Sequence, residues 1–594
     1  MDDDIRTEYR RRLEVRRNSQ KQLNQRHTNL GNGRLVLAIL AIYLGVKAFA
    51  YHALSPIWIL FPVFVFLLLA IIHEYVIRAL SRSSRAIAFY ARGLARLENR
   101  WIGTGETGDR FLDSSHPYST DLDLFGQGSL FQLLSTARTP MGEDTLAEWL
   151  TRAAPVRVVR QRQQLVSELR PKLDLREDLA VIAESLRSRI HPKALSSWGE
   201  GKLLLKGHWV RIIALVLGCL GILSLVAWAT WGTRSFFVIM VVVNVSFSLW
   251  FRKRIQVAVD AAEAAVHDLV LLSEVLARFE CENFQTPGLN ELQSSLKTHG
   301  WPPSRRIARL NRLIVLLDSR KNLFIKVVDP LVFWTLQLAF LVEAWRKESG
   351  SAIRGWLSAV GELEALLALS NYSFEHPGNA LPEIVEEGPC FIGEGIAHPL
   401  IPEGRAVRND LQLDRQIQIM VVSGSNMSGK STLLRTVGID TALALAGASV
   451  PAQRLRLSPL AIGASIHVQD SLQSGVSRFY AEITRLRRIL DLTLEPLPVL
   501  FLVDEFLQGT NSHDRRIGAE AIVRSLVKRG AIGLVTTHDL ALTQIAEELS
   551  PLARNVHFED QLIEGQLHFD YKLRPGIVQK SNALELMRSV GIDV

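Results

Sequence analysis

The sequence predicts a chain of several domains that is helical over most of its length and α/β at its C-terminal end. Three observations lead to this fold class. Two pairs of apolar runs occur in the first half, and long stretches with helical apolar spacing surround the second pair. A β-branched run near residue 420 then stops at a glycine-bearing turn that leads into a helix. With 594 residues, the chain has room for about four domains.

The composition indicates membrane segments but leaves the partner open. Hydrophobic residues make up 48% of the chain, which is high for a soluble protein. The formal net charge of +8 permits nucleic acid or anionic lipid as a partner and proves neither. Cys219, Cys281 and Cys390 lie far apart in the sequence, which argues against a disulfide framework or a zinc site and fits a reducing compartment.

The first pair of apolar runs follows a basic arm. Residues 1–34 contain no apolar run, and we expect a cytosolic arm that is helical or partly disordered. Leu35–Tyr51 is 17 residues long with Lys47 as its charged residue, and Ala53–Ile72 is 20 residues long without a charge. Both are long enough to cross a bilayer core, so residues 35–77 are predicted to form a first transmembrane hairpin.

The second pair of apolar runs predicts another hairpin at residues 212–251. Ile212–Trp231 and Ser235–Phe251 are uncharged, and the turn between them contains Arg234. The other flanking cations lie on the side of the termini: Arg34, Arg78, Arg82, Arg85, Lys206, Arg211, Arg252, Lys253 and Arg254. This asymmetry predicts a multi-pass protein of the inner or plasma membrane, with its bulk and both termini in the cytoplasm. The alternative is four buried core helices.

The remaining middle of the chain is predicted to be helical. Residues 108–207 have apolar spacing broken at glycine and proline, which indicates short packed helices that lead into a longer one. Residues 255–375 continue with long amphipathic patterns. Pro330–Val342 is apolar but short for a membrane span, so we expect a core helix there. The periodicity does not distinguish a lever that couples distant sites from an ordinary helical domain.

The glycine-bearing turn matches the phosphate-binding P-loop pattern in full. The run Gly424, Ser425, Asn426, Met427, Ser428, Gly429, Lys430, Ser431, Thr432 follows a predicted strand and opens a predicted helix. Glycines allow backbone N–H groups to face phosphate oxygens, Lys430 adds a positive charge there, and the Ser431 hydroxyl suits Mg²⁺. The sequence therefore predicts an ATP site with Mg²⁺.

Two later strands carry the side chains expected to act on the nucleotide. Pro498–Glu505 is an apolar run that ends in adjacent carboxylates. This is typical of a Walker B element in which Asp504 reaches Mg²⁺ and Glu505 polarises the attacking water. The strand Ile532–Thr537 ends at His538, which we interpret as a γ-phosphate contact rather than an ordinary polar residue.

These residues resemble the MutS family of DNA mismatch-repair ATPases. The family's loop typically reads TGPNMGGKST, and generic P-loops rarely carry Asn-Met at these positions. Further matches keep the family's order: His398-Pro399, residues 470–479 with Glu482, residues 509–512, Thr537-His538, Tyr571-Lys572-Leu573 with Gly576, and, upstream, residues 128–130 with 139–142. The resemblance implies a C-terminal P-loop ATPase domain of ABC type at residues 385–594. It also implies a helical lever domain at 108–207 and 255–375.

The resemblance also implies a homodimer and suggests DNA as a ligand. In the family two nucleotide domains face each other, so Ser474 would reach the γ-phosphate of the partner's ATP. The family's mismatch-reading domain uses a Phe-x-Glu, which occurs nowhere in this sequence. A hairpin stands where the family inserts a DNA clamp. We therefore expect a membrane-anchored ATPase with ATP-dependent, structure-selective DNA binding and no mismatch reading. The alternatives are an ATP-driven remodeller or scaffold of a membrane protein and, less favoured, a transporter ATPase.

Overall fold

The computed structural model describes residues 2–184, 190–205, 207–425, 427–466, 478–507, 512–538, 540–563 and 566–578. The chain divides into two compact units. Unit 1 contains Met1–Thr136, Thr145–Glu177 and Ala365–Val594, and unit 2 contains Ala137–Asp144 and Asp178–Glu364. The stretch that the sequence assigned to one lever domain is thus divided, because residues 108–136 and 145–177 lie with the C-terminal domain in unit 1.

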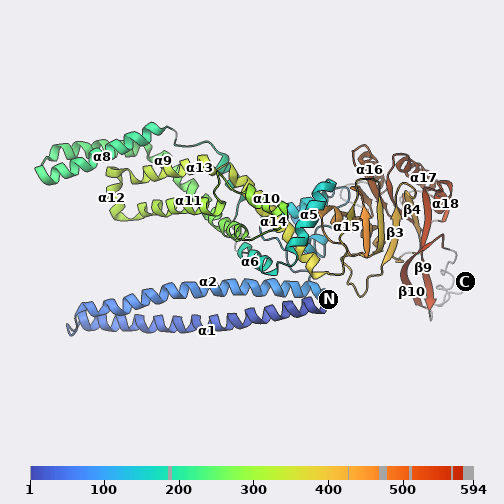
Figure 1. Ribbon diagram of the computed structural model, residues 1–594, viewed down its shortest axis with the longest axis horizontal. Coiled ribbons are helices and arrows are strands. Elements are labelled where there is room, and N and C mark those ends of the chain that lie inside the picture. Colours follow the sequence, from blue (N-terminus) through green and yellow to red (C-terminus); the bar gives the residue numbers. More distant parts are fainter. Residues whose placement is uncertain are drawn as a thin grey trace. The chain divides into compact units, whose positions relative to one another are not determined.

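Unit 1 begins with a long helical hairpin. Helix α1 (Asp2–Phe49) and helix α2 (Leu60–Leu97) lie side by side, joined through the 3₁₀ turn η1 (Pro56–Ile59) (Figure 1). Helix α1 runs through the predicted arm into the apolar run without a break, so the arm is not a separate element. Helix α2 begins at Leu60, seven residues into the apolar run that starts at Ala53, and Pro56 occupies the first turn of η1.

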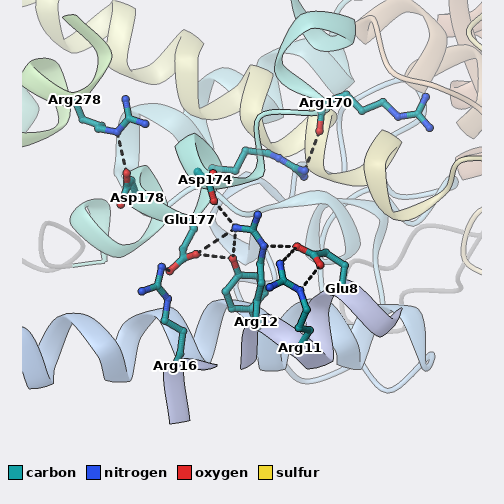
Figure 2. Close-up of polar contacts among 11 residues, drawn as sticks. Glu8, Arg11, Arg12, Arg16, Arg170, Asp174, Glu177, Asp178 and Arg278 are labelled. Carbon is teal, nitrogen blue, oxygen red and sulfur yellow. Dashed lines mark hydrogen bonds and ion pairs between the residues drawn. The ribbon is translucent and has the colours of Figure 1, made fainter. Parts of the chain in front are cut away.

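The ends of this hairpin that lie away from the apolar runs are held by an ionic cluster (Figure 2). Glu8 of α1 accepts hydrogen bonds from Arg11 at 2.7 and 2.8 Å and from Arg12 at 2.6 Å. Arg12 also pairs with Asp174 of α6 (Leu173–Ala183). Glu177 of α6 pairs with Arg16 at 2.7 Å and accepts a hydrogen bond from the Tyr90 hydroxyl of α2 at 2.5 Å. Both helices of the hairpin are therefore fixed to α6.

A second, buried set of contacts fixes the hairpin to helix α14 (Ala352–Glu375) within unit 1. Arg96 of α2 donates to the Glu375 carboxylate, and the Tyr9 hydroxyl donates to the same group at 3.2 Å. The Tyr9 ring is 1% exposed and stacks on Phe374 with ring centroids 5.8 Å apart. Hydrogen bonds satisfy the buried charges of Arg96 and Glu375. These contacts therefore hold the end of the hairpin against α14.

Unit 2 contains the second hairpin, formed by α8 (His208–Trp231) and α9 (Arg234–Glu280). Within the part of the chain that the structure describes, these two helices and α1 and α2 are the four that are, by length and composition, apolar enough to cross a membrane. Asn244 of α9 is buried, and its side-chain amide donates to the Leu217 carbonyl of α8 at 3.3 Å. Its amide also lies 3.5 Å from the Leu331 carbonyl of α12 (Leu323–Val332). Helix α12 therefore packs against the middle of the apolar hairpin.

The prediction of one continuous core helix at Pro330–Val342 is wrong, because the structure has a break there. Helix α12 ends at Val332 and α13 (Trp334–Ser349) begins two residues later. Phe333 between them has the left-handed φ of 53°, and its ring is buried at 2% exposure against Phe247. Asp329 accepts a hydrogen bond from the Thr335 N–H at 2.7 Å, which satisfies a free donor at the start of α13. The chain thus changes from one helix to the next at a buried phenylalanine.

Short helices complete the helical parts. They are η2 (Asp109–Phe111), α3 (Leu130–Leu134), α4 (Pro140–Thr151), α5 (Val156–Leu169), α7 (Pro192–Glu200), α10 (Pro287–Ser295), α11 (Pro303–Asp318) and η3 (Ser319–Lys321). Within unit 2, the buried face of α11 packs along α9. Glu280 at the end of α9 accepts from the Ser304 N–H at 3.0 Å, whereas Arg320 pairs with Glu263 at 2.9 Å. The two helices are therefore antiparallel.

The C-terminal domain is built on a mixed six-stranded sheet in the order β10-β9-β4-β8-β7-β6. Its strands are β4 (Ile419–Ser423), β6 (Ala461–Ser465), β7 (Val499–Val503), β8 (Ile532–Thr537), β9 (Ala553–Ile563) and β10 (Gln566–Pro575). All neighbours are parallel except β9 and β10, which form an antiparallel pair. The helices that lie between these strands in the sequence are α15 (Lys430–Ala446), α16 (Arg478–Leu492), α17 (Ser512–Lys528) and α18 (Leu540–Glu548).

A second sheet of four strands combines three strands that precede β4 in the sequence with β5, which follows it. Its order is β1-β5-β2-β3, with β1 (Glu383–Ile384), β2 (Phe391–Ile396), β3 (Asn409–Leu413) and β5 (Arg454–Leu457). In the six-stranded sheet, β4, β7 and β8 are buried along their whole length, as expected for parallel strands covered on both faces. This rigid centre determines where the loops after β4, β7 and β8 emerge.

Candidate nucleotide-binding site

Three predicted site segments meet at the carboxyl edge of the six-stranded sheet. Ser423, the last residue of β4, is in register with Thr537, the last residue of β8. Val503, the last residue of β7, is in register with Val535 of β8. Because the three strands are parallel, the loops that follow them leave at one edge, where open α/β sheets bind ligands. The structure thus brings together the phosphate loop, the two carboxylates and His538.

Lys430 is held inside the phosphate loop. It is the first residue of α15, is 4% exposed, and donates hydrogen bonds to the carbonyls of Gly424 at 2.9 Å and Ser425 at 2.8 Å. Burial lowers the pKa of Lys430, whereas Glu505 and Asp504 act in the opposite direction. The ammonium group therefore lies where the loop closes, beside the N-terminus of α15, which favours anions.

The loop has the features of a cradle for a phosphate group. Gly429 has φ of 103°, a left-handed conformation that favours glycine, and it immediately precedes α15. The Ser425 and Ser428 hydroxyls are buried and have no hydrogen-bond partner within the described residues. Unsatisfied buried hydroxyls are costly, so these groups fit a loop that receives acceptor oxygens from a ligand. The residues present thus fit the triphosphate of ATP.

The two carboxylates after β7 have different environments. The Asp504 N–H donates to the Ser465 carbonyl at 2.9 Å, and its carboxylate accepts from the Thr536 hydroxyl. The Thr536 hydroxyl also accepts from the Glu505 N–H at 3.0 Å. Thr536 therefore fixes both acidic residues to β8. The sequence does not reveal this role, because a threonine inside an apolar strand gives no signal of its own.

Glu505 lies between the other two charged groups of the site. Its Oε1 atom is 3.9 Å from Lys430 Nζ and 3.3 Å from His538 Nδ1. Glu505 also has the left-handed φ of 51°, which is uncommon for a residue with a side chain. The side chain is 19% exposed, compared with 48% for His538. The carboxylate is thus close to the phosphate loop and still reachable by water, as a general base requires.

Tyr571 is a further residue of the site whose place the sequence did not reveal. It belongs to β10, and its ring lies so close to the loop that a Cβ added to Gly429 would be 3.1 Å from Cδ1. Asn409 of β3 holds its backbone, donating to the Tyr571 carbonyl at 3.0 Å. The ring is therefore a candidate for stacking on the nucleotide. The sequence signal was its aromatic character in a run that resembles the family's C-terminal motif.

The structure describes some of the other predicted site residues and not others. Met427 has φ of 72° and is 85% exposed, Ser431 is partly buried in the first turn of α15, and Thr432 is exposed beside it. Asn426 and Ser474 lie outside the described residues. Glu482 is described: it is buried and accepts a hydrogen bond from the Leu507 N–H, just beyond the carboxylates.

Comparison with known proteins identifies this domain. Residues 420–593 match the family described as MutS domain V. The C-terminal domain is thus a MutS domain V, and the chain is similar over part of its length to proteins named MutS and MutS2. The predicted resemblance is thereby confirmed, together with an α/β MutS domain at the C-terminus and a largely helical remainder.

Three curated proteins are similar to part of this chain. The DNA mismatch repair protein MutS of Brevibacillus brevis is 30% identical over 276 residues, which is 46% of this chain and 32% of that protein. The protein of the same name from Natronomonas pharaonis is 33% identical over 238 residues, 39% of this chain and 27% of its own length. Endonuclease MutS2 of Thermus thermophilus is 34% identical over 203 residues, 33% of this chain and 25% of its own length. The chain thus spans about a third or less of each.

Proposed function

We propose that this protein is a membrane-anchored ATPase whose nucleotide state controls binding of nucleic acid. One observation carries the catalytic part: Glu505 Oε1 lies 3.9 Å from the ammonium group of Lys430 and 3.3 Å from His538. This arrangement suits hydrolysis of a phosphate bond held in the loop at residues 424–432. The match to MutS domain V supports the same activity.

Each side chain of the site has a distinct proposed role. Lys430 neutralises phosphate oxygens, and Ser431 and Asp504 hold Mg²⁺, which supplies charge stabilisation for the phosphate groups. Glu505 orients and deprotonates the attacking water, and His538 contacts the γ-phosphate. The Thr536 hydroxyl positions Asp504 through its carboxylate and Glu505 through its backbone N–H. Hydrolysis of ATP by the purified protein, lost on Glu505→Gln with ATP binding retained, tests these assignments.

The membrane part of the proposal rests on the four apolar helices. Their exposed surfaces are rich in large hydrophobic side chains, including Ile42, Phe64, Leu223 and Ile239, each at least 58% exposed. Soluble proteins rarely expose apolar patches of that kind, and lipid is the solvent that matches them. Flanking cations favour cytoplasmic termini and a multi-pass topology in the inner or plasma membrane. Carbonate extraction and protease accessibility of the Asp504 region test this topology.

A homodimer is the proposed assembly. It follows from the family resemblance, in which Ser474 of one subunit contacts ATP bound to the other. Mixing subunits provides a sharp test, because a Ser474→Ala subunit and a Glu505→Gln subunit damage different halves of each composite site. Mixed dimers should then retain one intact site, with turnover above that of either variant alone. Mixtures that show only the average of the two variants contradict the shared site.

The nucleic-acid part of the proposal concerns phosphate contacts rather than mismatch reading. Reading a mispair needs an apolar wedge to offset a few kcal/mol of unstacking, and the sequence contains no Phe-x-Glu. Binding should therefore weaken with salt and prefer a G·T mismatch over matched duplex by less than about tenfold, equivalent to about 1.4 kcal/mol. Competition binding at fixed salt measures the ratio, and a larger preference restores a mismatch-repair role.

A second candidate function is remodelling of a membrane protein without nucleic acid. The observation that favours it is the buried attachment of hairpin α1–α2 to the end of α14, eight residues before β1 of the C-terminal domain. Such a joint suits transmission of an ATP-driven movement to the membrane. Absence of binding to any polynucleotide, with normal ATP hydrolysis, would favour this function. A transporter is less favoured, because the apolar runs carry Lys47 alone as a charged group.

A further inference from the structure

Unit 2 contains a basic and aromatic cavity far along the chain from the nucleotide site. Its volume is about 800 Å³, and it lies between the N-terminal half of α11, the turn that precedes this helix, and α13. Arginines and tryptophans dominate its lining: Arg305, Arg306, Arg309, Arg312, Trp301 and Trp345. Glu348 also lines it, and it pairs with Arg306 at 3.5 Å. The net charge of the wall is therefore strongly positive.

Three of these arginines form a stripe on one face of α11. Arg305, Arg309 and Arg312 are spaced at four and three residues, so they lie on the same side of the helix. The opposite side, with Ile307, Leu310, Ile314 and Leu317, is buried. All three arginines are exposed, and none forms an ion pair with any residue that the structure describes. At about 1.5 Å per residue, the stripe extends over roughly 10 Å.

Trp301 provides an aromatic surface beside the stripe. Its side chain is 55% exposed, although tryptophan is usually well covered. A backbone bridge between Thr298 and Trp301, with hydrogen bonds of 3.0 and 3.1 Å, fixes the turn that carries it. The guanidinium of Arg305 lies over the ring at 5.9 Å from its centroid. The ring is thus positioned next to the cations while one surface remains accessible.

We propose that this cavity binds a single-stranded polynucleotide, with Arg305, Arg309 and Arg312 on successive phosphates and Trp301 stacked on a base. This inference rests on the proposed nucleic-acid function and assigns it to α11. A basic track next to an exposed aromatic ring is the combination that binds single strands without sequence preference. A duplex presents no unstacked base to Trp301, so it should bind more weakly than a single strand.

The distance from the apolar hairpin argues against a lipid headgroup as the occupant. Ser304 at the start of α11 bonds to Glu280, whereas Arg320 beyond its end pairs with Asp260 and Glu263. The stripe is therefore at the end of α9 remote from its apolar part, which is predicted to end at Phe251. Along a helix, Phe251 and Glu280 are about 40 Å apart. Attraction to an anionic membrane surface is screened over about 8–10 Å, so it does not reach the stripe.

The test compares two triple variants of the full-length protein in nanodiscs of neutral phosphatidylcholine. Arg305→Gln/Arg309→Gln/Arg312→Gln removes the stripe. The matched control, Arg17→Gln/Lys21→Gln/Arg26→Gln, removes three exposed cations of α1 that likewise have no ion pair among the described residues. Fluorescence anisotropy with a labelled oligothymidylate of about 20 nucleotides, an RNA of equal length and a matched duplex is measured at several salt concentrations.

The stripe variant should lose affinity for the single strand by tenfold or more, and its log–log salt slope should fall by about 2, since each phosphate contact contributes roughly 0.7. Trp301→Leu should weaken binding by about fivefold or more and leave the salt slope unchanged. The control variant should bind normally. ATP hydrolysis, measured in the same samples without nucleic acid, should be equal in all of them.

Several outcomes overturn the inference, and they can be told apart. Equal binding by the stripe variant and the control assigns any nucleic-acid contact to another surface and leaves the proposed function standing. No binding of any polynucleotide by the unmodified protein refutes the nucleic-acid function itself. If phosphatidylglycerol vesicles bind the unmodified protein but not the stripe variant, and oligonucleotide binding is the same in both, the stripe is a lipid site instead. If Trp301→Leu binds the single strand with unchanged affinity, Trp301 does not stack on a base.

Discussion

The guanidinium of Arg96 donates two hydrogen bonds to the carboxylate of Glu375, at 2.6 and 2.7 Å, although 279 residues separate them. Their side chains are 10% and 1% exposed. Tyr9 and Asn371 donate to the same carboxylate, at 3.2 and 2.8 Å. The end of hairpin α1–α2 and the end of α14 therefore form one joint directly before the C-terminal domain.

Arg96→Ala should destabilise unit 1 by about 3–5 kcal/mol, because it leaves the carboxylate of Glu375 buried without its cation. Thermal unfolding in detergent measures the effect. The exposed pair Arg354–Glu200, with oxygen and nitrogen 2.7 Å apart, is a matched control. Arg354→Ala should cost about 0–1 kcal/mol, since water replaces an exposed partner easily. Equal effects of the two substitutions would contradict a buried joint.

Lys430→Ala should weaken ATP binding by at least about tenfold, since a hydrogen bond from a charged group contributes roughly 1.5–3 kcal/mol. The same change removes the bonds from Nζ to the carbonyls of Gly424 and Ser425. Binding is measured with labelled ATP, and Lys528→Ala at the exposed end of α17 is the control. Unchanged affinity in the Lys430 variant would show that the phosphates bind elsewhere.

Glu505→Gln should retain ATP and lower its hydrolysis by roughly 10² to 10⁴, the usual contribution of a general base. The amide keeps the size of the side chain near Lys430 and His538 but cannot take a proton from water. Single-turnover hydrolysis separates this effect from binding. If Glu505→Gln turns over normally and His538→Asn does not, the base is His538.

Glu364 should make the stability of unit 2 depend on pH. Burial raises the pKa of Glu364 to about 7, although hydrogen bonds from Arg138 and Thr139 act to lower it. Its contribution to stability is complete below pH 4.5, where the unfolded chain also binds the proton, and is lost as the pH rises through about 7. Unfolding free energies of the parent and Glu364→Gln should therefore diverge between these values, by up to about 1.4 kcal/mol per pH unit. A difference that does not change with pH would refute this ionisation.

The sequence predicted the parts of the fold and site that depend on adjacent residues. The phosphate loop, the paired carboxylates and the strand that ends at His538 each lie within one short segment, and parallel pairing brings their ends together. The attachment of Glu375 to Arg96 and Tyr9 was not predictable, because its members are 279 and 366 residues apart and look like ordinary polar helix positions. Likewise, no local signal marks Phe333 as a helix break or brings Tyr571 to Gly429.

Co-flotation measures in one experiment whether this protein binds a membrane, binds a nucleic acid and changes that binding with ATP. Neutral vesicles carrying the Glu505→Gln protein are mixed with a labelled single-stranded oligonucleotide, with and without Mg²⁺-ATP, and floated through a density gradient. We predict that protein and oligonucleotide float together, that the bound fraction changes with ATP, and that a rise in salt from about 50 to 200 mM releases the oligonucleotide. Protein left below the vesicles, or vesicles that float without oligonucleotide in every nucleotide state, would contradict the account.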